Sequence, residues 1–326
     1  MGDKIAMPRR HIWPFPVMAA LFAALPFLLK NDYHVGILVV IGINTILALG
    51  LNMLMGYAGQ VSLGHAAFYG IGAYTTAILT TSLKWSPWFG LIAAILVTGL
   101  IAYLIGKPTL KLKGHYLAMA TLGFGMIVKI FFVQCSTLTG GTSGINGIPP
   151  ISIAGMELVT DRQYYYLVWF FVIALIWLSY NIVDSRIGRA LRAVHGSEIA
   201  AASMGVNTAK YKVQVFVLSG MYSGLAGALY AHSLRFVNPD PFGFMFSIQL
   251  VVMVVIGGMA SIWGAITGAS TITLLGELLR SFEDYEVLVF GAILMFVMVY
   301  MPAGLTKSAV DLMARRKLAK ARAGQQ

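Results

Sequence analysis

Residues 35–74 read VGILVVIGINTILALGLNMLMGYAGQVSLGHAAFYGIGAY and contain no aspartate, glutamate, lysine or arginine. A helix needs about 20 predominantly apolar residues to cross the hydrocarbon core of a bilayer. This stretch therefore holds one complete crossing, at residues 35–55, and most of a second crossing, at residues 61–83. The sequence predicts a bundle of membrane-spanning helices.

The composition of the whole chain agrees with this class. Of its 326 residues, 58% are hydrophobic and 11% are charged, and the mean hydropathy is +0.79. Soluble domains carry about 25% charged residues, so we expect an all-α polytopic membrane protein. No long hydrophilic block interrupts the apolar segments, and residues 1–326 are predicted to form a single transmembrane domain. The one cysteine, Cys135, excludes a disulfide framework within the chain.

The apolar segments together predict about ten spans. A weak break at residues 257–264, GGMASIWG, divides the long apolar block 246–279 into two helices. The first apolar segment has no cleavage pattern, so we expect it to be retained as a helix. The predicted spans are 13–29, 35–55, 61–83, 89–106, 116–133, 164–180, 213–233, two within 246–279, and 287–301.

The distribution of lysine and arginine tests this arrangement, because these residues concentrate in the cytoplasmic segments of membrane proteins. With both termini in the cytoplasm, 17 of the 23 basic side chains fall inside, five fall outside and Lys129 lies within a span. The net charge of +11 therefore indicates orientation, not a nucleic-acid partner. We expect a cytoplasmic N-terminus, an outer loop, a cytoplasmic loop and a basic cytoplasmic tail, at residues 1–12, 134–163, 181–212 and 305–326.

Residues 50–74 combine many glycines with polar side chains at membrane depth. Irregular backbone at this depth must be buried in protein or line a water-filled cavity. One interpretation is a broken helix beside a translocation path. The alternative is close helix packing through small residues, which we prefer for the glycines. The polar side chains that are candidates for lining or gating a path are Asn52, Gln60, Ser62 and His65.

The polar segment 181–212, NIVDSRIGRALRAVHGSEIAAASMGVNTAKYK, is the main internal interruption of the apolar sequence. Its five basic residues place it in the cytoplasm, and its alanine-rich centre predicts one short helix ended by Gly205. On such a helix, Arg189 and Arg192 share a side with Ser203. Small alanine side chains would let the helix enter a groove on a soluble partner. The alternative is a basic loop that binds anionic membrane lipid.

Motifs of catalysis are missing from the sequence. There is no G-x-x-x-x-G-K-[ST] phosphate loop, no H-E-x-x-H pair and no G-x-S-x-G elbow. We therefore expect no enzymatic activity and no cofactor bound by this chain, so any ATP must be used by another protein. Intramembrane carboxylates are scarce, which argues against a stand-alone proton-coupled transporter or channel. Glycine-rich broken spans would be unnecessary in a simple membrane anchor.

Four blocks follow one another along the chain, and they read GLNMLMGYAGQVSLGHAAFYGIGAYTTAIL, LKLKGHYLAMATLGFG, LTGGTSGINGIP and GRALRAVHGSEIAAASMGVNTAKYKVQVFVLSGMYSGLAGALYAH. They resemble the branched-chain amino acid permeases of ABC transporters, and their order and spacing are similar to the LivM-type subunit. The resemblance covers roughly residues 50–304. It implies a vitamin B12 importer-like (type II) permease fold with broken helices, in a bacterial inner membrane.

The resemblance also implies partners and a substrate. The partners are a second permease subunit of the LivH type, two cytoplasmic ABC ATPases that use ATP, and a periplasmic binding protein. The chain would form half of the pathway for leucine, isoleucine or valine. A neighbouring branch of the family is associated with urea or short amides, and the motifs leave that substrate class open.

Residue roles follow from the same resemblance. Glu198 and Gly205 are similar to the coupling signature of ABC permeases, although the glycine stands one residue farther from the glutamate than usual. Met126 stands where relatives often carry a glutamate. The residues implied to couple the chain to an ATPase are Arg189, Arg192, Glu198, Ala200, Ala201 and Gly205.

Overall fold

The computed structural model describes residues 31–279 except 113 and 154, together with residues 22, 25, 26, 291, 292 and 295. The predicted first span at 13–29, the last span at 287–301 and the basic tail lie outside these residues, apart from the six isolated positions. Within the described part, the chain is mostly helical, as predicted.

Six described helices are long and apolar enough to cross a membrane. Two shorter helices, α3 (His65–Thr81) and the apolar α11 (Phe244–Gly257), complete the described bundle. The count of ten spans remains a prediction. The six long helices are α2 (Asp32–Asn52, continued by the π-helix η1, Met53–Tyr57), α4 (Pro87–Thr109), α5 (His115–Gln134), α7 (Asp161–Asp184), α10 (Thr208–Leu234) and α12 (Ile262–Leu279).

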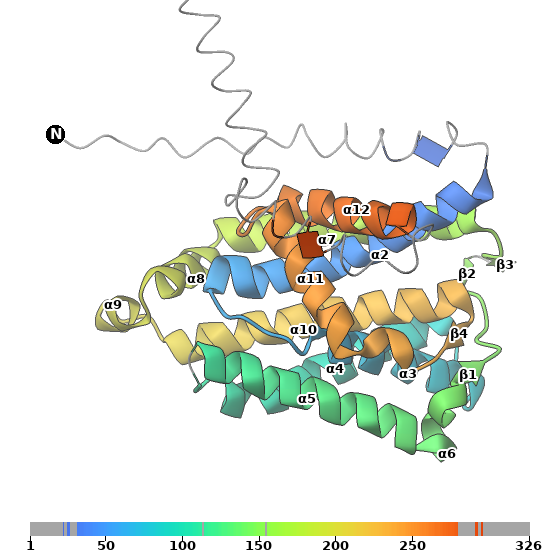
Figure 1. Cartoon of the computed structure of the whole chain (residues 1–326), viewed down its shortest axis with the longest axis horizontal. Coiled ribbons are helices and arrows are strands. Elements are labelled where there is room, and N and C mark those ends of the chain that lie inside the picture. Colours follow the sequence, from blue (N-terminus) through green and yellow to red (C-terminus); the bar gives the residue numbers. More distant parts are fainter. Residues whose placement is uncertain are drawn as a thin grey trace, which may run out of the picture.

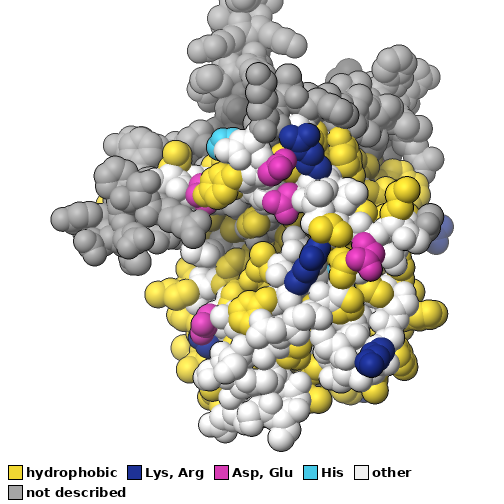
Figure 2. Space-filling model, turned by 90° about the vertical axis from the view of Figure 1, so that its right-hand side faces the viewer, with side chains coloured by type: hydrophobic (Ala, Val, Ile, Leu, Met, Phe, Trp, Pro, Cys, Tyr) yellow, Lys and Arg dark blue, Asp and Glu magenta, His cyan; other side chains and the backbone are white. Residues whose placement is uncertain are grey.

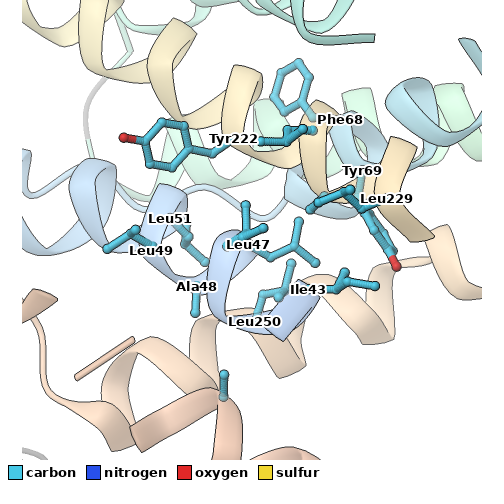
Figure 3. Close-up of a cluster of buried hydrophobic side chains, with 14 of the residues drawn as sticks. Ile43, Leu47, Ala48, Leu49, Leu51, Phe68, Tyr69, Tyr222, Leu229 and Leu250 are labelled. Atoms are coloured by element: carbon cyan, nitrogen blue, oxygen red, sulfur yellow. The ribbon is translucent and has the colours of Figure 1, made fainter. Parts of the chain in front are cut away.

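Helices α2 and α10 form the centre of the bundle (Figure 1). α10 packs against α2, α3 and α4, whereas α2 also packs against α7, α11 and α12. Figure 3 shows Leu47 of α2 among apolar side chains of the neighbouring helices, including Leu229 of α10 and Leu250 of α11, and all three are fully buried. α5 lies at the edge of the bundle and is largely exposed.

Small residues allow the central helices to approach each other closely. A Cβ added to Gly72 of α3 would lie 2.3 Å from the carbonyl oxygen of Gly224 in α10. A Cβ added to Gly268 of α12 would lie 1.9 Å from the carbonyl oxygen of Met253 in α11. Packing of this kind is typical of membrane helices, which gain little from a hydrophobic effect between apolar surfaces in lipid. Within residues 50–74, Gly72 therefore has the packing role that we prefer for the glycines of that stretch.

Two chain segments break their helices inside the bundle. After η1, residues 59–64 are not helical, and α3 begins only at His65, so the predicted continuous span at 61–83 is wrong at its start. The second break separates α11 from α12 at residues 258–261. This second break confirms the division predicted at residues 257–264.

One end of the bundle, which we call the strand end, carries short irregular elements (Figure 1). Trp88, at the start of α4, donates a hydrogen bond to the carbonyl of Ser152 (2.8 Å) and ties this end to the bundle. Figure 2 views this end and shows acidic and basic side chains scattered among hydrophobic and uncharged groups. The elements are α6 (Ser136–Thr139), η2 (Gly141–Ser143), η3 (Asp240–Phe242), and the antiparallel pairs β1 (Ile145–Asn146) with β4 (Phe236–Val237) and β2 (Ser152–Ile153) with β3 (Met156–Glu157).

The opposite end, which we call the basic end, carries α8 (Arg186–Gly196) and α9 (Glu198–Ser203). The prediction of one short helix in this segment is wrong, because Ser197 is extended (φ −164°, ψ 116°) and divides it in two. Arg189 and Arg192 therefore do not share a helix with Ser203. The hydroxyl of Ser197 accepts a hydrogen bond from the Ala200 amide (3.3 Å), so it serves as the N-cap of α9.

We predict that Gly227→Ala destabilises the bundle. Its new Cβ would lie 2.1 Å from the Tyr69 carbonyl oxygen, which is backbone and cannot turn away. Forcing α3 and α10 apart should cost about 1–3 kcal/mol and lower the unfolding temperature of the purified protein in detergent. The matched control is Gly276→Ala in α12, where nothing lies within 4 Å and alanine improves helix propensity. Equal unfolding temperatures for the two variants would contradict the packing interpretation.

Candidate functional site

Helix α8 is amphipathic and lies against the end of the bundle. Leu191 and Val194 are buried, whereas Arg189 and Arg192 are exposed. The Arg189 guanidinium donates a hydrogen bond to the carbonyl of Asp184 (3.2 Å), at the end of α7. The apolar face thus holds α8 to the bundle and the arginines are presented outward.

Helix α9 projects beyond α8 at the extreme end of the molecule (Figure 1). Its two central alanines differ, because Ala201 is 4% exposed and packs inward, while Ala200 is exposed. Of these two alanines, only Ala200 is therefore accessible to another molecule. The expected helix end at Gly205 is confirmed, since this residue has a left-handed backbone (φ +81°) and the following amide, of Val206, bonds back to the Ala201 carbonyl (3.0 Å).

Two apolar residues on α9 and its C-cap are strongly exposed. Ile199 is 75% exposed and Met204 is 84% exposed. Sequence reasoning missed both residues because it weighed the alanines and the charges of the segment. The available signal was the presence of large apolar side chains in a short polar segment. Exposed apolar side chains on a projecting helix are typical of a protein-binding surface.

The base of α9 is fixed by an ion pair between the half-buried Glu198 and the buried Lys212 of α10. Lys212 is 5% exposed and also donates a hydrogen bond to the Leu110 carbonyl (3.0 Å), beyond the end of α4. A buried ammonium requires such partners, because its desolvation is costly. The pair joins α9, α10 and the end of α4, so Lys212, one of the five basic residues of this segment, has a structural role inside the protein.

The basic end also contacts the broken helix that follows α2. Gly59 is left-handed (φ +68°), and a Cβ added to it would lie 3.3 Å from Cγ of His195 in α8. α8 therefore packs directly on the start of the non-helical segment 59–64. A displacement of α8 would therefore act directly on segment 59–64 inside the bundle.

Three of the four polar candidates within the bundle are buried, and two of them share one cluster. The His65 imidazole lies 3.1 Å from the Ser62 hydroxyl and 2.5 Å from the Ser219 hydroxyl of α10. All three side chains are at most 1% exposed. The cluster connects the end of segment 59–64 to the central helix. Gln60 does not join it, since its amide is half-buried and donates to the Ala58 carbonyl (3.1 Å).

Asn52 lies apart from this cluster and forms hydrogen bonds with the backbone of the second helix break. Its amide nitrogen donates to the Ser261 carbonyl (2.7 Å), and its amide oxygen accepts from the Ala260 backbone N–H (3.0 Å). Breaks at membrane depth leave backbone groups that need such partners. The structure thus gives Asn52 a clear supporting contact at the α11–α12 break.

A small void of about 10 Å³ adjoins the non-helical segment, α5 and the start of α11. Its lining includes Leu63, Gly125, Met126 and Phe244. A single water molecule needs about this much space, so the void does not hold an amino acid in this conformation. Met126 is 54% exposed on α5, and this face of the bundle is open to a neighbouring molecule.

Comparison with known proteins gives a consistent result. The family described as "Branched-chain amino acid transport system / permease component" matches residues 33–298. LivM, the high-affinity branched-chain amino acid transport permease protein of Salmonella typhimurium, is 34% identical over 314 residues, which cover 89% of this chain and 74% of that protein. The Escherichia coli LivM protein is 33% identical over 311 residues, covering 88% and 73% of the two chains.

A second type of permease is also similar. The Salmonella typhimurium LivH protein is 25% identical over 280 residues, which cover 80% of this chain and 90% of LivH. No solved structure matches the chain. The match to the family extends over both helix breaks, α8 and α9. The chain belongs to the permease component family of branched-chain amino acid transport systems.

Proposed function

We propose that this chain is the permease subunit of an ABC importer and forms half of the translocation pathway for leucine, isoleucine and valine. Its relatives are transport permeases and not enzymes, which supports the expectation that it has no catalytic activity of its own. The observation that carries the proposal is the projecting apolar surface at Ile199 and Met204. A permease without a phosphate loop does not hydrolyse ATP itself, so it needs a surface that an ATPase subunit can bind and displace.

The proposed orientation places the basic end in the cytoplasm. Its basic side chains follow the positive-inside rule, whereas the strand end carries acidic side chains beside its basic ones. The strand end then faces the periplasm of a bacterial inner membrane, where a binding protein delivers the substrate. With the spans at 13–29 and 287–301, the chain has about ten helices and both termini in the cytoplasm. A vitamin B12 importer-like arrangement is part of this proposal.

The proposed assembly contains two permeases and two ATPases. The chain is similar both to LivM and, more weakly, to LivH, which supports pairing with a LivH-type subunit. The largely exposed α5 is available to complete a pathway with that subunit. ATP is bound by the ATPase subunits and not by this chain.

In the proposed mechanism, an ATPase groove receives Ala200, Ile199 and Met204. Arg189 and Arg192 flank this surface and add charge recognition. The Glu198–Lys212 ion pair keeps α9 from moving independently, so its displacement is passed on to α8 and α10. Contact between His195 and Gly59 then carries the motion to segment 59–64.

Segment 59–64 is the proposed gate of the pathway. His65, directly after this segment, shares hydrogen bonds with Ser62 and with Ser219, and Gln60 is half-buried near the start of the segment. Asn52 keeps the neighbouring α11–α12 break in place while the gate moves. The closed void beside Leu63 corresponds to a shut pathway.

The function is tested by isolating the chain from its native membrane and by reconstitution. We expect ATPase subunits and a second permease to co-purify, and we expect ATP-dependent uptake of labelled leucine in liposomes only with the binding protein present. Transport by this chain alone, without ATP, would overturn the proposal in favour of a stand-alone transporter. Uptake of labelled urea but not leucine would instead support the urea or short-amide branch.

The docking surface makes a second prediction. Changing both Ile199 and Met204 to aspartate places two charges in an apolar contact, so ATPase co-purification and leucine uptake should fall at least tenfold while membrane insertion is unchanged. Met156→Asp is a matched control, because Met156 is 76% exposed at the strand end. It should leave ATPase co-purification intact. Normal ATPase binding by the α9 double variant would refute this surface.

The ion pair makes a third prediction. Glu198→Ala leaves the buried Lys212 ammonium with only the Leu110 carbonyl, which should cost about 2–4 kcal/mol of stability. The double variant Glu198→Ala with Lys212→Met removes both charges and should recover most of the loss. Thermal unfolding of four proteins, namely wild type, Glu198→Ala, Lys212→Met and the double variant, gives the coupling energy of the pair. Additive effects would mean that the two side chains do not interact.

A further inference from the structure

A broad groove opens at the basic end, between the end of α4, helix α9 and the start of α10. It encloses about 1140 Å³. Tyr103 and Lys107 form the α4 wall, Ile199 and Ser203 form the α9 wall, and the floor contains Lys212. This groove is separate from the polar cluster and the small void described above.

The rim of the groove carries uncompensated positive charge. Lys107, Lys111 and Lys210 are exposed and line the groove. Within the described residues, none of these three lysines forms an ion pair, whereas Lys212 on the floor is neutralised by Glu198. An anion held at the rim would meet three cationic groups, from α4, from the turn that follows it and from α10.

The polarity of the lining changes along the helices. Tyr103 lies one turn, about 6 Å, before Lys107 on α4, and Val217 lies about 10 Å beyond Lys210 on α10. Both side chains line the same groove, together with Val213. Because α4 and α10 are apolar spans, the apolar part of the groove lies on the membrane side of the lysines.

The start of α10 adds polar groups at the level of the lysines. Asn207 caps the helix by accepting a hydrogen bond from the Lys210 amide (3.0 Å), and Thr208 brings a hydroxyl to the lining. The first amides of this 27-residue helix carry the positive end of its dipole. Phosphate oxygens suit such a combination of amides, hydroxyl and ammonium groups.

We propose that this groove is a binding site for one anionic phospholipid, with its phosphate-containing headgroup at Lys107, Lys111 and Lys210. One acyl chain lies along Tyr103, Val213 and Val217. Basic pockets between spans on the cytoplasmic side are known to suit anionic headgroups. A free phosphate would leave the apolar half of the groove unfilled, and only an amphipathic ligand satisfies both halves.

The proposed lipid also touches the helix that meets the ATPase. Ile199 and Ser203 form one wall of the groove, so the bound lipid supports α9 from the membrane side. This regulatory consequence rests on the proposed function of α9, whereas the binding of lipid does not. Anionic lipid should therefore increase the coupling between ATP hydrolysis and uptake.

Lipid binding is tested on the purified transporter by native mass spectrometry after exchange into phosphatidylcholine containing phosphatidylglycerol. We expect wild type to retain one phosphatidylglycerol, and the triple variant Lys107→Gln, Lys111→Gln, Lys210→Gln to bind it roughly tenfold more weakly or worse. The control removes the same charge from the same end of the molecule, by changing Arg186, Arg189 and Arg192 to glutamine. It should retain the lipid.

A second variant tests the apolar half of the groove without changing charge. Val213→Trp fills the acyl-chain wall and should displace the phosphatidylglycerol, and millimolar inorganic phosphate should not. Retention of lipid by the lysine variant or by Val213→Trp, equal loss in the arginine control, or displacement by phosphate would each overturn the site. These measurements use neither ATP nor amino acid, so their failure is distinct from a failure of the proposed function.

Discussion

The lipid bilayer offers no hydrogen-bond partner to a peptide group, and this constraint shapes the whole chain. A continuous helix meets it by its own hydrogen bonds, but the part of the bundle that the structure describes contains two interruptions, at residues 59–64 and 258–261. Each interruption receives hydrogen-bond partners from the side chain of a distant helix. Thr121 of α5 accepts a hydrogen bond from the Leu63 amide (3.0 Å), and Asn52 serves both Ala260 and Ser261. The irregular segments exist only because the bundle surrounds them.

Hydropathy in the sequence predicted the position of most described spans, because the thickness of a bilayer fixes how many apolar residues are needed. It underestimated the length of several helices. α7 begins at Asp161, not 164, and α10 begins at Thr208, not 213. Helices continue past the apolar region where polar side chains and caps support them, such as Thr160 and Asn207. Hydropathy therefore indicates which part of a helix lies in the hydrocarbon core of the bilayer, and not where the helix begins and ends.

The details of the candidate site were less accessible from the sequence. The glycines at 257 and 264 revealed the α11–α12 break, since glycine is a local signal. The Ser197 break was not recognised, although Ser197 and Glu198 begin a helix-capping pattern. The Glu198–Lys212 pair and the contact of Ser219 with His65 join residues that are 14 and 154 positions apart. Such contacts depend on how the helices are placed, which local patterns do not determine.

The two hydrogen bonds of Asn52 also constrain the order in which the protein is assembled. Its partners at Ala260 and Ser261 are more than 200 residues later in the chain, as the separations of 208 and 209 positions state. During synthesis, α2 is complete long before the ribosome reaches the α11–α12 break. Until then the amide of Asn52 must form its hydrogen bonds with water or with other groups. The α11–α12 break then completes its backbone bonding on a side chain that is already present in the early part of the chain.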